Sequence, residues 1–326
     1  MLRRLWLALV VLVIGLATPT LAQDEVELKW NFSKDQKPFY QTLTSKTVQD
    51  MTVMGQPVKQ EQTQEFVFSW TVKEASADKV VLEQKIEAVM MTIKIGSNEI
   101  KYDSRAKDAA DNQLAAFFKP MLGATFTITL DPKTMKVTAV GGREEFVTNM
   151  AKANPSMGNL LKTILSDDQF RQMTEPAFAV LPPPGQKVKR GSQWTRESKL
   201  AMGPIGSYDA VYTFTYDGTE KRVIDGKDAN YHKIKMEAKL TYKPPEGPSP
   251  AGLTFKIEGG TVTTKKAEGT IFFDAERGRV AEATMDVVLE GKLTVTVSEQ
   301  KGEVTLNQTQ NVRTTTSDRN PVEPPK

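Results

Sequence analysis

Apolar and polar residues alternate along most of the chain with a period of two, as expected of a β-strand that has one buried face. In residues 65–72, EFVFSWTV, this alternation puts Phe66, Phe68 and Trp70 on the same face. Comparable alternation occurs in residues 207–218, 232–242 and 281–299. One apolar and one polar face predicts antiparallel strands with a solvated side.

Residues 143–178 break this alternation and place apolar residues at helical spacing. In residues 157–166, MGNLLKTILS, apolar side chains recur at positions i, i+3, i+4, i+7 and i+8. Ser166, followed three residues later by Gln169, is typical of a capping box at the start of a helix. Two or three short amphipathic helices are therefore predicted. Such helices are marginal alone and need a partner surface.

The apolar surface of these helices is the candidate ligand-binding surface. It is expected to rest on the apolar face of a curved sheet that includes Phe66, Phe68 and Trp70. The helices are either a lid that opens at low cost or a plug in the core, protected from hydrogen exchange as strongly as the strands. We expect the plug. The candidate ligand-binding residues are Met150, Met157, Leu161, Leu165, Phe170 and Met173.

The predicted fold class is mainly β (α+β), with long antiparallel meandering strands in two β-rich halves and the short helices between them. A curved or half-barrel sheet is one arrangement of such strands. Three consecutive prolines, Pro182 to Pro184, mark the clearest joint because they force extended backbone. The predicted organisation is a signal peptide (1–22), an N-terminal β-rich half (23–142), a helical segment (143–178), a Pro/Gly linker (179–193), a C-terminal β-rich half (194–316) and a disordered tail (317–326).

The spacing I-x-x-D-x5-V occurs once in each half. It is found in residues 128–137, ITLDPKTMKV, and again in residues 271–280, IFFDAERGRV. Asp131 and Asp274 stand where a turn would begin, and an Asp side chain there can accept hydrogen bonds from backbone amides two residues on. Each copy is predicted to be a strand, a tight turn and a returning strand. The two copies are either a duplicated unit or one local solution used twice.

The stretch LPPPGQKVKRGSQW, with the spacing P-x3-V-x2-G-x2-W, resembles a stretch in an uncharacterised family of secreted bacterial proteins. Members of that family also pair a signal peptide with a cysteine-poor, β-rich body. The resemblance covers most of the mature chain and implies no activity. From the residues themselves, Gly191 is expected to turn the chain and Trp194 to anchor the start of a strand in the core.

The first residues predict export. A basic start, the apolar run LWLALVVLVIGLA and small residues before Gln23 are typical of a secretory signal peptide. A permanent membrane anchor is the alternative, but the run is short for a bilayer span and Pro19 follows it. The mature chain is therefore expected to be extracytoplasmic, either periplasmic or secreted, and soluble. No integral membrane span is expected after cleavage.

Composition excludes several chemistries. With no cysteine, the chain has no disulfide, thiolate nucleophile or Cys-based metal site. The one histidine, His232, is in phase with the apolar residues of a strand, so neither a zinc site nor a Ser-His-Asp arrangement is expected. The 43 Lys and Arg residues nearly balance the 40 Asp and Glu residues, which does not favour nucleic acid as a partner. No cofactor is expected.

Three function classes follow from these observations. The leading prediction is an exported, non-catalytic protein that serves as an interaction or structural module with a protein partner. The alternative is a carrier or binder of an apolar, lipid-like small molecule held between curved sheet and helices. An enzyme is the least favoured class because no catalytic constellation is visible. An open apolar groove, as opposed to a closed core, would distinguish the first two.

Overall fold

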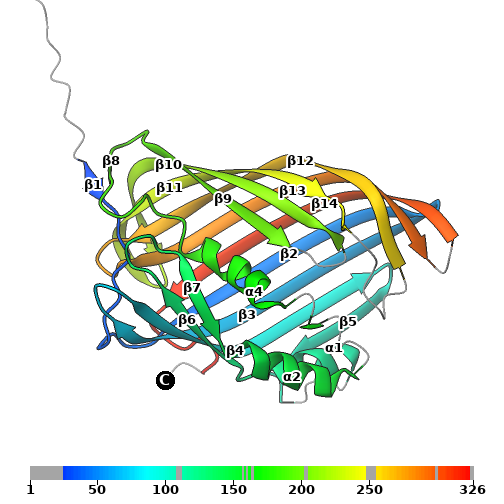
Figure 1. Cartoon of the computed structure of the whole chain (residues 1–326), viewed down its shortest axis with the longest axis horizontal. Helices are drawn as coiled ribbons and strands as arrows, with labels where there is room; N and C mark the ends of the chain where they lie inside the picture. The colour runs from blue at the N-terminus through cyan, green and yellow to red at the C-terminus, as the bar shows by residue number, and fades with distance from the viewer. Residues whose placement is uncertain are drawn as a thin grey trace, which may run out of the picture.

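The computed structural model describes residues 25–323, apart from residues 108–111, 156–157, 159–160, 163–164, 202–204, 247–254 and 298–299 (Figure 1). The predicted signal peptide and Met157 lie outside the described residues. Strands dominate, which confirms the predicted fold class.

In the described part of the chain, twelve strands form one antiparallel sheet. Their order across the sheet is β7-β6-β4-β3-β2-β14-β13-β12-β11-β10-β9, and β5 pairs with β4. The strands of this sheet are β2 (Phe39–Val53), β3 (Gln56–Ala75), β4 (Val80–Ile95), β5 (Asn98–Asp103), β6 (Thr125–Leu130), β7 (Val137–Gly141), β9 (Gln193–Ala201), β10 (Ser207–Ile224), β11 (Lys227–Lys243), β12 (Phe255–Asp274), β13 (Arg279–Val297) and β14 (Gln300–Ser317). Two short strands, β1 (Val26–Glu27) and β8 (Lys187–Val188), pair separately.

The two β-rich halves are joined edge to edge into this single sheet. Strand β2, the first of the N-terminal half, pairs along its length with β14, the last of the C-terminal half, so that Tyr40 lies opposite Ser317 and Val53 opposite Val304. From β9 onward, each strand across the sheet follows the previous one in sequence, except at this junction and where β5 branches from β4. The halves therefore share one continuous meander.

Tight turns with residues in the left-handed region create two of the long hairpins. Met54 and Gly55 connect β2 to β3 with φ of 48° and 81°. Asp225 and Gly226 connect β10 to β11 with φ of 52° and 74°. Two successive positive φ angles match the right-handed twist of the flanking strands.

The sheet has two faces of different chemistry. We call concave the face that carries Leu43, Phe66 and Ala283, which the register places on one side. The opposite, convex face carries residues such as Lys46, Glu61 and Glu290, all of them exposed. Side chains that alternate along one strand therefore belong alternately to the two faces.

The helices whose bounds the described residues define are α1 (Gln113–Phe118), α2 (Arg143–Ala153) and α4 (Asp167–Thr174), with 3₁₀ turns η1 (Lys119–Met121) and η3 (Glu175–Ala177). Helices α1 and α2 contact each other beside β5. Helix α4 contacts both edge strands, β7 and β9, and lies between them in front of the concave face (Figure 1). The sheet curves so far that one helix spans the distance between its edges.

Local signals explain where these helices begin. The Ser166 side chain accepts a hydrogen bond from the Gln169 backbone N–H, as the capping-box pattern predicts, and Asp167 and Asp168 occupy the first turn of α4. Helix α1 was missed in the sequence because its apolar residues, Leu114–Phe118, form one short uninterrupted run that shows no helical spacing. Its N-cap is Asn112, whose side chain accepts from the Ala115 N–H.

Both I-x-x-D-x5-V segments are hairpins, as predicted. Asp131 starts the β6–β7 turn and accepts from the Lys133 N–H at 2.8 Å, while Asp274 starts the β12–β13 turn and accepts from the Glu276 N–H at 3.1 Å. Four residues after each Asp the backbone is left-handed, at Met135 (φ 57°) and Gly278 (φ 60°). The two turns therefore share one geometry.

The predicted boundary of the tail falls inside the sheet. Ser317 is the last residue of β14, and Asp318 forms ion pairs with Arg277 and Arg279 of the β12–β13 turn. These charge pairs hold Asp318 against the neighbouring hairpin.

Candidate functional site

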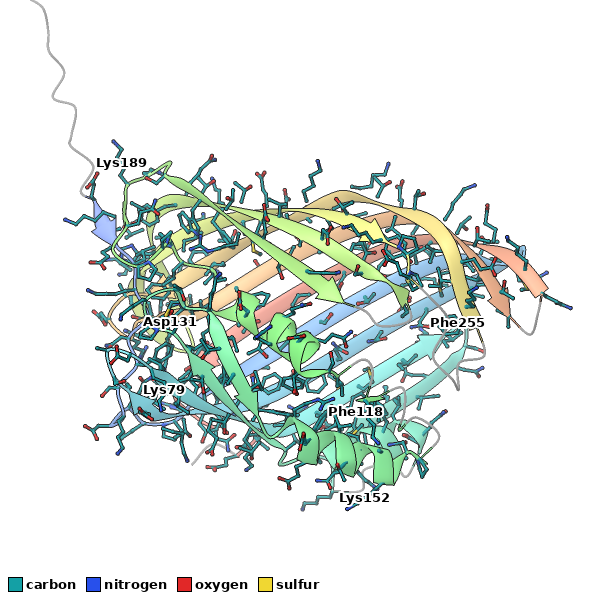
Figure 2. All side chains as sticks on the ribbon, in the orientation of Figure 1. Lys79, Phe118, Asp131, Lys152, Lys189 and Phe255 are labelled. Atoms are coloured by element: carbon teal, nitrogen blue, oxygen red, sulfur yellow. The ribbon has the colours of Figure 1, made fainter. Side chains whose placement is uncertain are left out.

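A cavity of about 620 Å³ lies between the concave face and the helices. Its floor comes from the sheet, its roof comes from residues 146–180, and Trp30 of the N-terminal segment also borders it. Figure 2 shows the side chains of the sheet and of α4 in this region. The lining residues are Trp30, Gln41, Leu43, Phe66, Phe68, Trp70, Gln84, Ile86, Phe117, Met121, Phe126, Phe146, Met150, Leu161, Leu165, Phe170, Met173, Thr174, Ala177, Val180, Ile271, Val280, Ala283 and Thr314.

The roof contains most of the candidate ligand-binding residues. Met150, Leu161, Leu165, Phe170 and Met173 all line the cavity, and Met157 lies outside the described residues. Their burial differs widely: Met150 is 0% exposed, whereas Met173 is 58% exposed. The structure thus brings the five described candidates around one space, from a fully buried end to an exposed rim. Whether they bind a ligand stays a prediction.

Aromatic contacts hold floor and roof together. Phe66 and Phe68, on neighbouring concave positions of β3, stack with ring centroids 5.9 Å apart. Phe126 of β6 contacts Phe170 of α4 at 4.8 Å and Phe146 of α2 at 5.2 Å. Phe66 and Phe68 pack against the buried cluster that includes Phe146 and Met150 of α2. Trp70 meets the edge of Phe178 at 6.0 Å. The expected contact between the helical segment and the Phe66–Phe68–Trp70 face is therefore present.

The two helices of the roof differ in how firmly they are packed. Helix α2 buries Phe146, Val147 and Met150, and the Arg143 guanidinium donates to the backbone oxygen of Leu165. Helix α4 buries none of its residues fully. Among the helices with defined bounds, α4 is the one that contacts both β7 and β9, so the less buried helix spans the gap between the edges of the sheet.

No charged side chain is found among the described residues that line the cavity. Its polar lining residues are Gln41, Gln84, Thr174 and Thr314, all neutral. The Thr174 hydroxyl donates to the Phe170 backbone oxygen at 2.8 Å, and Gln41 Nε2 lies 3.4 Å from Thr316 Oγ1. The remaining lining residues are apolar.

A second hollow of about 300 Å³ lies on the other side of α4, against β9 and β10. Its lining includes Glu175, Arg196, Glu197 and Lys199. Burial lowers the pKa of Arg196, whose Nη2 donates to the Leu181 backbone oxygen at 2.9 Å. The second hollow therefore differs from the first in having charged side chains in its lining, although Tyr212, Phe214 and Met236 also line it.

The model of a family described as a family of unknown function, DUF6263, matches residues 77–301, more than half of the 326-residue chain. The chain belongs to this family. The predicted resemblance to an uncharacterised family is thereby confirmed. A search of curated proteins found no match.

Solved structures similar to this DUF6263 protein show only distant likeness. Lipovitellin, from a study of its lipid–protein interactions, has a TM-score of 0.41 and 9% identity, covering 85% of this chain and 25% of that one. DynF, from the dynemicin biosynthesis pathway of Micromonospora chersina, has a TM-score of 0.18 and 8% identity, covering 94% and 92%. A Bacteroides fragilis protein with a YmcC-like fold has a TM-score of 0.25 and 7% identity, covering 88% and 98%. The chain spans about a quarter of lipovitellin's length.

Two residues singled out in the sequence lie beside the cavity and do not line it. Trp194 is 6% exposed on the concave side of β9, stacks on Phe214 at 5.7 Å and donates from Nε1 to the Val180 backbone oxygen at 3.2 Å. Gly191 precedes it with φ 89°, a conformation that favours glycine.

The two turn aspartates lie at the end of the sheet, away from the cavity lining. Hydrogen bonds from the Lys133 N–H and the Thr134 hydroxyl hold the pKa of Asp131 below its ordinary value. Burial alone would raise the pKa of Asp274, but the Arg277 N–H and the Lys227 ammonium bring it below its ordinary value. Each carboxylate therefore accepts hydrogen bonds from residues of its own turn.

The single histidine takes part in a local hydrogen bond. His232 Nδ1 lies 2.8 Å from the Tyr216 hydroxyl, and burial lowers the pKa of the imidazole. Across the described residues, no group of three His, Asp or Glu side chains is arranged to hold a metal ion, and no helix is long and apolar enough to cross a membrane.

Sequence reasoning missed part of the lining. Trp30 precedes the sheet, and Phe117 and Met121 come from α1 and η1, outside the segment that showed helical spacing. The signal available for α1 was the aromatic pair Phe117–Phe118 behind the capping residue Asn112. No sequence pattern indicated Trp30, because its place at the cavity depends on how the N-terminal segment folds back against the sheet.

Proposed function

We propose that this DUF6263 protein is an exported, non-catalytic binder of a long apolar, lipid-like ligand, held between the concave face and the helices. The observation that carries the proposal is the cavity of about 620 Å³, lined by apolar residues and four neutral polar ones. Cavities of roughly 300–1,000 Å³ with such linings commonly bury small apolar molecules. This was the alternative function in the sequence, and the cavity now favours it over an interaction or structural module.

The lining also supports a non-catalytic role. General acid–base catalysis needs a titratable group within hydrogen-bond reach of the reacting atoms. None of the residues that line the cavity carries such a group. The charged hollow on the far side of α4 holds Glu175 and Arg196, but Arg196 already donates to the Leu181 backbone oxygen.

We infer that a ligand enters the cavity when α4 moves away from the sheet. An element that opens for a ligand must have low local stability, and α4, which contacts both β7 and β9, buries no residue fully. Helix α2, with Met150 completely buried, is the better candidate for a fixed plug. The lid and plug alternatives thus apply to different helices.

The test introduces one carboxylate on either face of the same strand. Thr314 of β14 lines the cavity, whereas Thr309 of the same strand is exposed on the convex face. A charge among apolar groups is costly to bury, so Thr314→Asp should weaken saturable binding of an uncharged fluorescent acyl probe at least tenfold. Thr309→Asp, the same substitution on the same strand, should leave binding unchanged.

Circular dichroism and denaturant unfolding of both variants separate loss of binding from loss of fold. Mass spectrometry of organic extracts from the purified wild-type protein would reveal ligands carried from the cell. No saturable binding to the wild type, or equal binding by the two folded variants, would refute the proposed function.

A further inference from the structure

Gln84 places an amide in the middle of the apolar floor of the cavity. Trp70 lies opposite it on β3, and Phe126 lies opposite it on β6. Leu82 and Ile86, two residues away along β4, share its face because side chains alternate along a strand. All four neighbours are buried, with exposures between 0% and 6%, whereas Gln84 is only half-buried and lines the cavity. With a buried side chain on each of its four sides, Gln84 exposes its surface away from the sheet, toward the cavity.

The amide of Gln84 has no partner within the part of the chain that the structure describes. Its oxygen and nitrogen hydrogen-bond to none of the described residues, and neither atom is fully buried. Among the other polar lining residues, Thr174 and Gln41 each have a partner, and Thr314 lies three strands away on β14. A few polar groups in an otherwise apolar pocket commonly fix the orientation of a ligand. The free amide of Gln84 is placed for that role.

The amide sets the chemistry of the group that fits beside it. Its Nε2 donates and its Oε1 accepts, so a ligand group that both accepts and donates leaves neither atom unpaired. A hydroxyl does this. An ether oxygen accepts from Nε2 but leaves Oε1 buried beneath the ligand without a hydrogen bond, which is unfavourable. A hydroxyl is also uncharged, which suits a lining whose described residues carry no charge.

We propose that Gln84 is a specificity-determining residue that binds the hydroxyl group of an uncharged long-chain lipid held in the cavity. A fatty alcohol and an acylglycerol with a free hydroxyl belong to this class. The inference rests on the proposed function and names the class of ligand. The hydrocarbon chain of the ligand then lies over Ile86, Phe68 and Phe66, which continue the apolar floor beyond Gln84.

The experiment compares three ligands of equal length: 1-dodecanol, 1-methoxyundecane, whose oxygen can accept but not donate, and tridecane. Each displaces an uncharged fluorescent acyl probe from the wild-type protein, from Gln84→Met and from Gln60→Met. Gln84→Met removes the amide but keeps a side chain of similar length. Gln60→Met is the matched control, because Gln60 is a half-buried glutamine on the same face of the sheet, outside the cavity lining.

We expect Gln84→Met to bind 1-dodecanol about three- to tenfold more weakly, the factor that one neutral hydrogen bond is worth. Tridecane should bind the variant at least as tightly as the wild type, because it no longer covers an unpaired amide. The ether should lose less affinity than the alcohol, and Gln60→Met should bind all three ligands as the wild type does. Equal changes for alcohol and hydrocarbon in Gln84→Met, or for alcohol and ether, would overturn the inference.

NMR of the side-chain amides in ¹⁵N-labelled wild-type protein gives a readout that needs no variant, since through-bond correlations assign each signal. Saturating 1-dodecanol should shift the Gln84 signal more than tridecane does and leave the Gln60 signal in place. Equal shifts of the Gln84 signal with both ligands would contradict the inference even if Gln84→Met failed to fold. If the probe itself did not bind, the proposed function would fail first, whereas probe binding without selectivity at Gln84 would refute this inference alone.

Discussion

The concave and convex faces of the sheet differ more in charge than in polarity. On the convex face the strands carry ion pairs, such as Lys265–Glu290 at 3.0 Å and Lys235–Asp217 at 3.1 Å. On the concave face, beyond the cavity, β2, β3 and β14 carry a neutral polar patch. Its residues are Ser45, Thr47, Gln49, Gln60, Gln62, Gln64, Gln308 and Gln310.

The neutral polar patch satisfies much of its hydrogen bonding internally. Gln49 Nε2 donates to Gln308 Oε1 at 2.7 Å, and Gln310 Nε2 donates to Ser45 Oγ at 3.1 Å. Side-chain amides can remain half-buried when they are hydrogen-bonded to one another in this way, whereas a charged group at the same place would need a counter-charge. The difference between the faces teaches that the alternation along these strands separates charged residues from neutral ones, and not only polar from apolar.

The largest expected effect concerns an aromatic anchor of the concave side. Trp194→Ala should lower the free energy of unfolding by about 3–5 kcal/mol, because it removes a buried ring stacked on Phe214. The exposed neighbour provides the control: Thr195→Ala should change it by less than about 0.5 kcal/mol. Urea denaturation measures both, and a loss below about 1 kcal/mol for Trp194→Ala would move Trp194 out of the core.

A smaller effect is expected when a charge enters the neutral polar patch. Gln310→Glu replaces the amide that donates to Ser45, itself 5% exposed, with a carboxylate that cannot donate. The free energy of unfolding at neutral pH should fall by about 1–3 kcal/mol. Thr309→Glu, on the exposed convex side of the same strand, should change it by less than about 0.5 kcal/mol. Equal costs for the two variants would show that the concave face tolerates charge as well as the convex one.

The smallest effect belongs to the convex face. Lys265 and Glu290 form an ion pair with both side chains 51% exposed. Lys265→Gln should therefore cost less than about 1 kcal/mol of unfolding free energy, and added salt should reduce the difference further. A larger, salt-independent loss would mean that the convex ion pairs hold the sheet together, contrary to the distinction drawn between the faces.

Local patterns in the sequence predicted the strands and the roof of the cavity because both depend on near neighbours. Period-two alternation around Phe66 and Phe68 gave the floor, and helical spacing from Met150 to Met173 gave the roof. That floor and roof face each other could also be predicted, because each has an apolar face that must be buried against another apolar surface. The apolar surface formed by the five described candidate residues could therefore be predicted from the sequence pattern alone.

Long-range features could not be predicted in the same way. Nothing local in β2 specifies β14 as its partner, since several strands have compatible alternation. The surroundings of the Trp70 ring come from Phe39, which stacks on it, and Phe178, which meets it edge-on, and both residues are distant from Trp70 in sequence. The contribution of Trp30 likewise depends on the path of the chain before β2.

The junction between β2 and β14 has a consequence for how quickly the chain folds. Pairing Tyr40 with Ser317 closes nearly the whole chain into one loop, and contacts of such sequence separation slow folding. In a circular permutant that joins the end of β14 to β2 and opens the chain between β7 and β9, each strand of the large sheet except β6, which pairs with β4, would pair with its immediate predecessor. The final sheet would be unchanged, but its mean contact order would fall. Comparing the refolding rates of the permutant and the natural chain would therefore show how much the natural strand order slows folding.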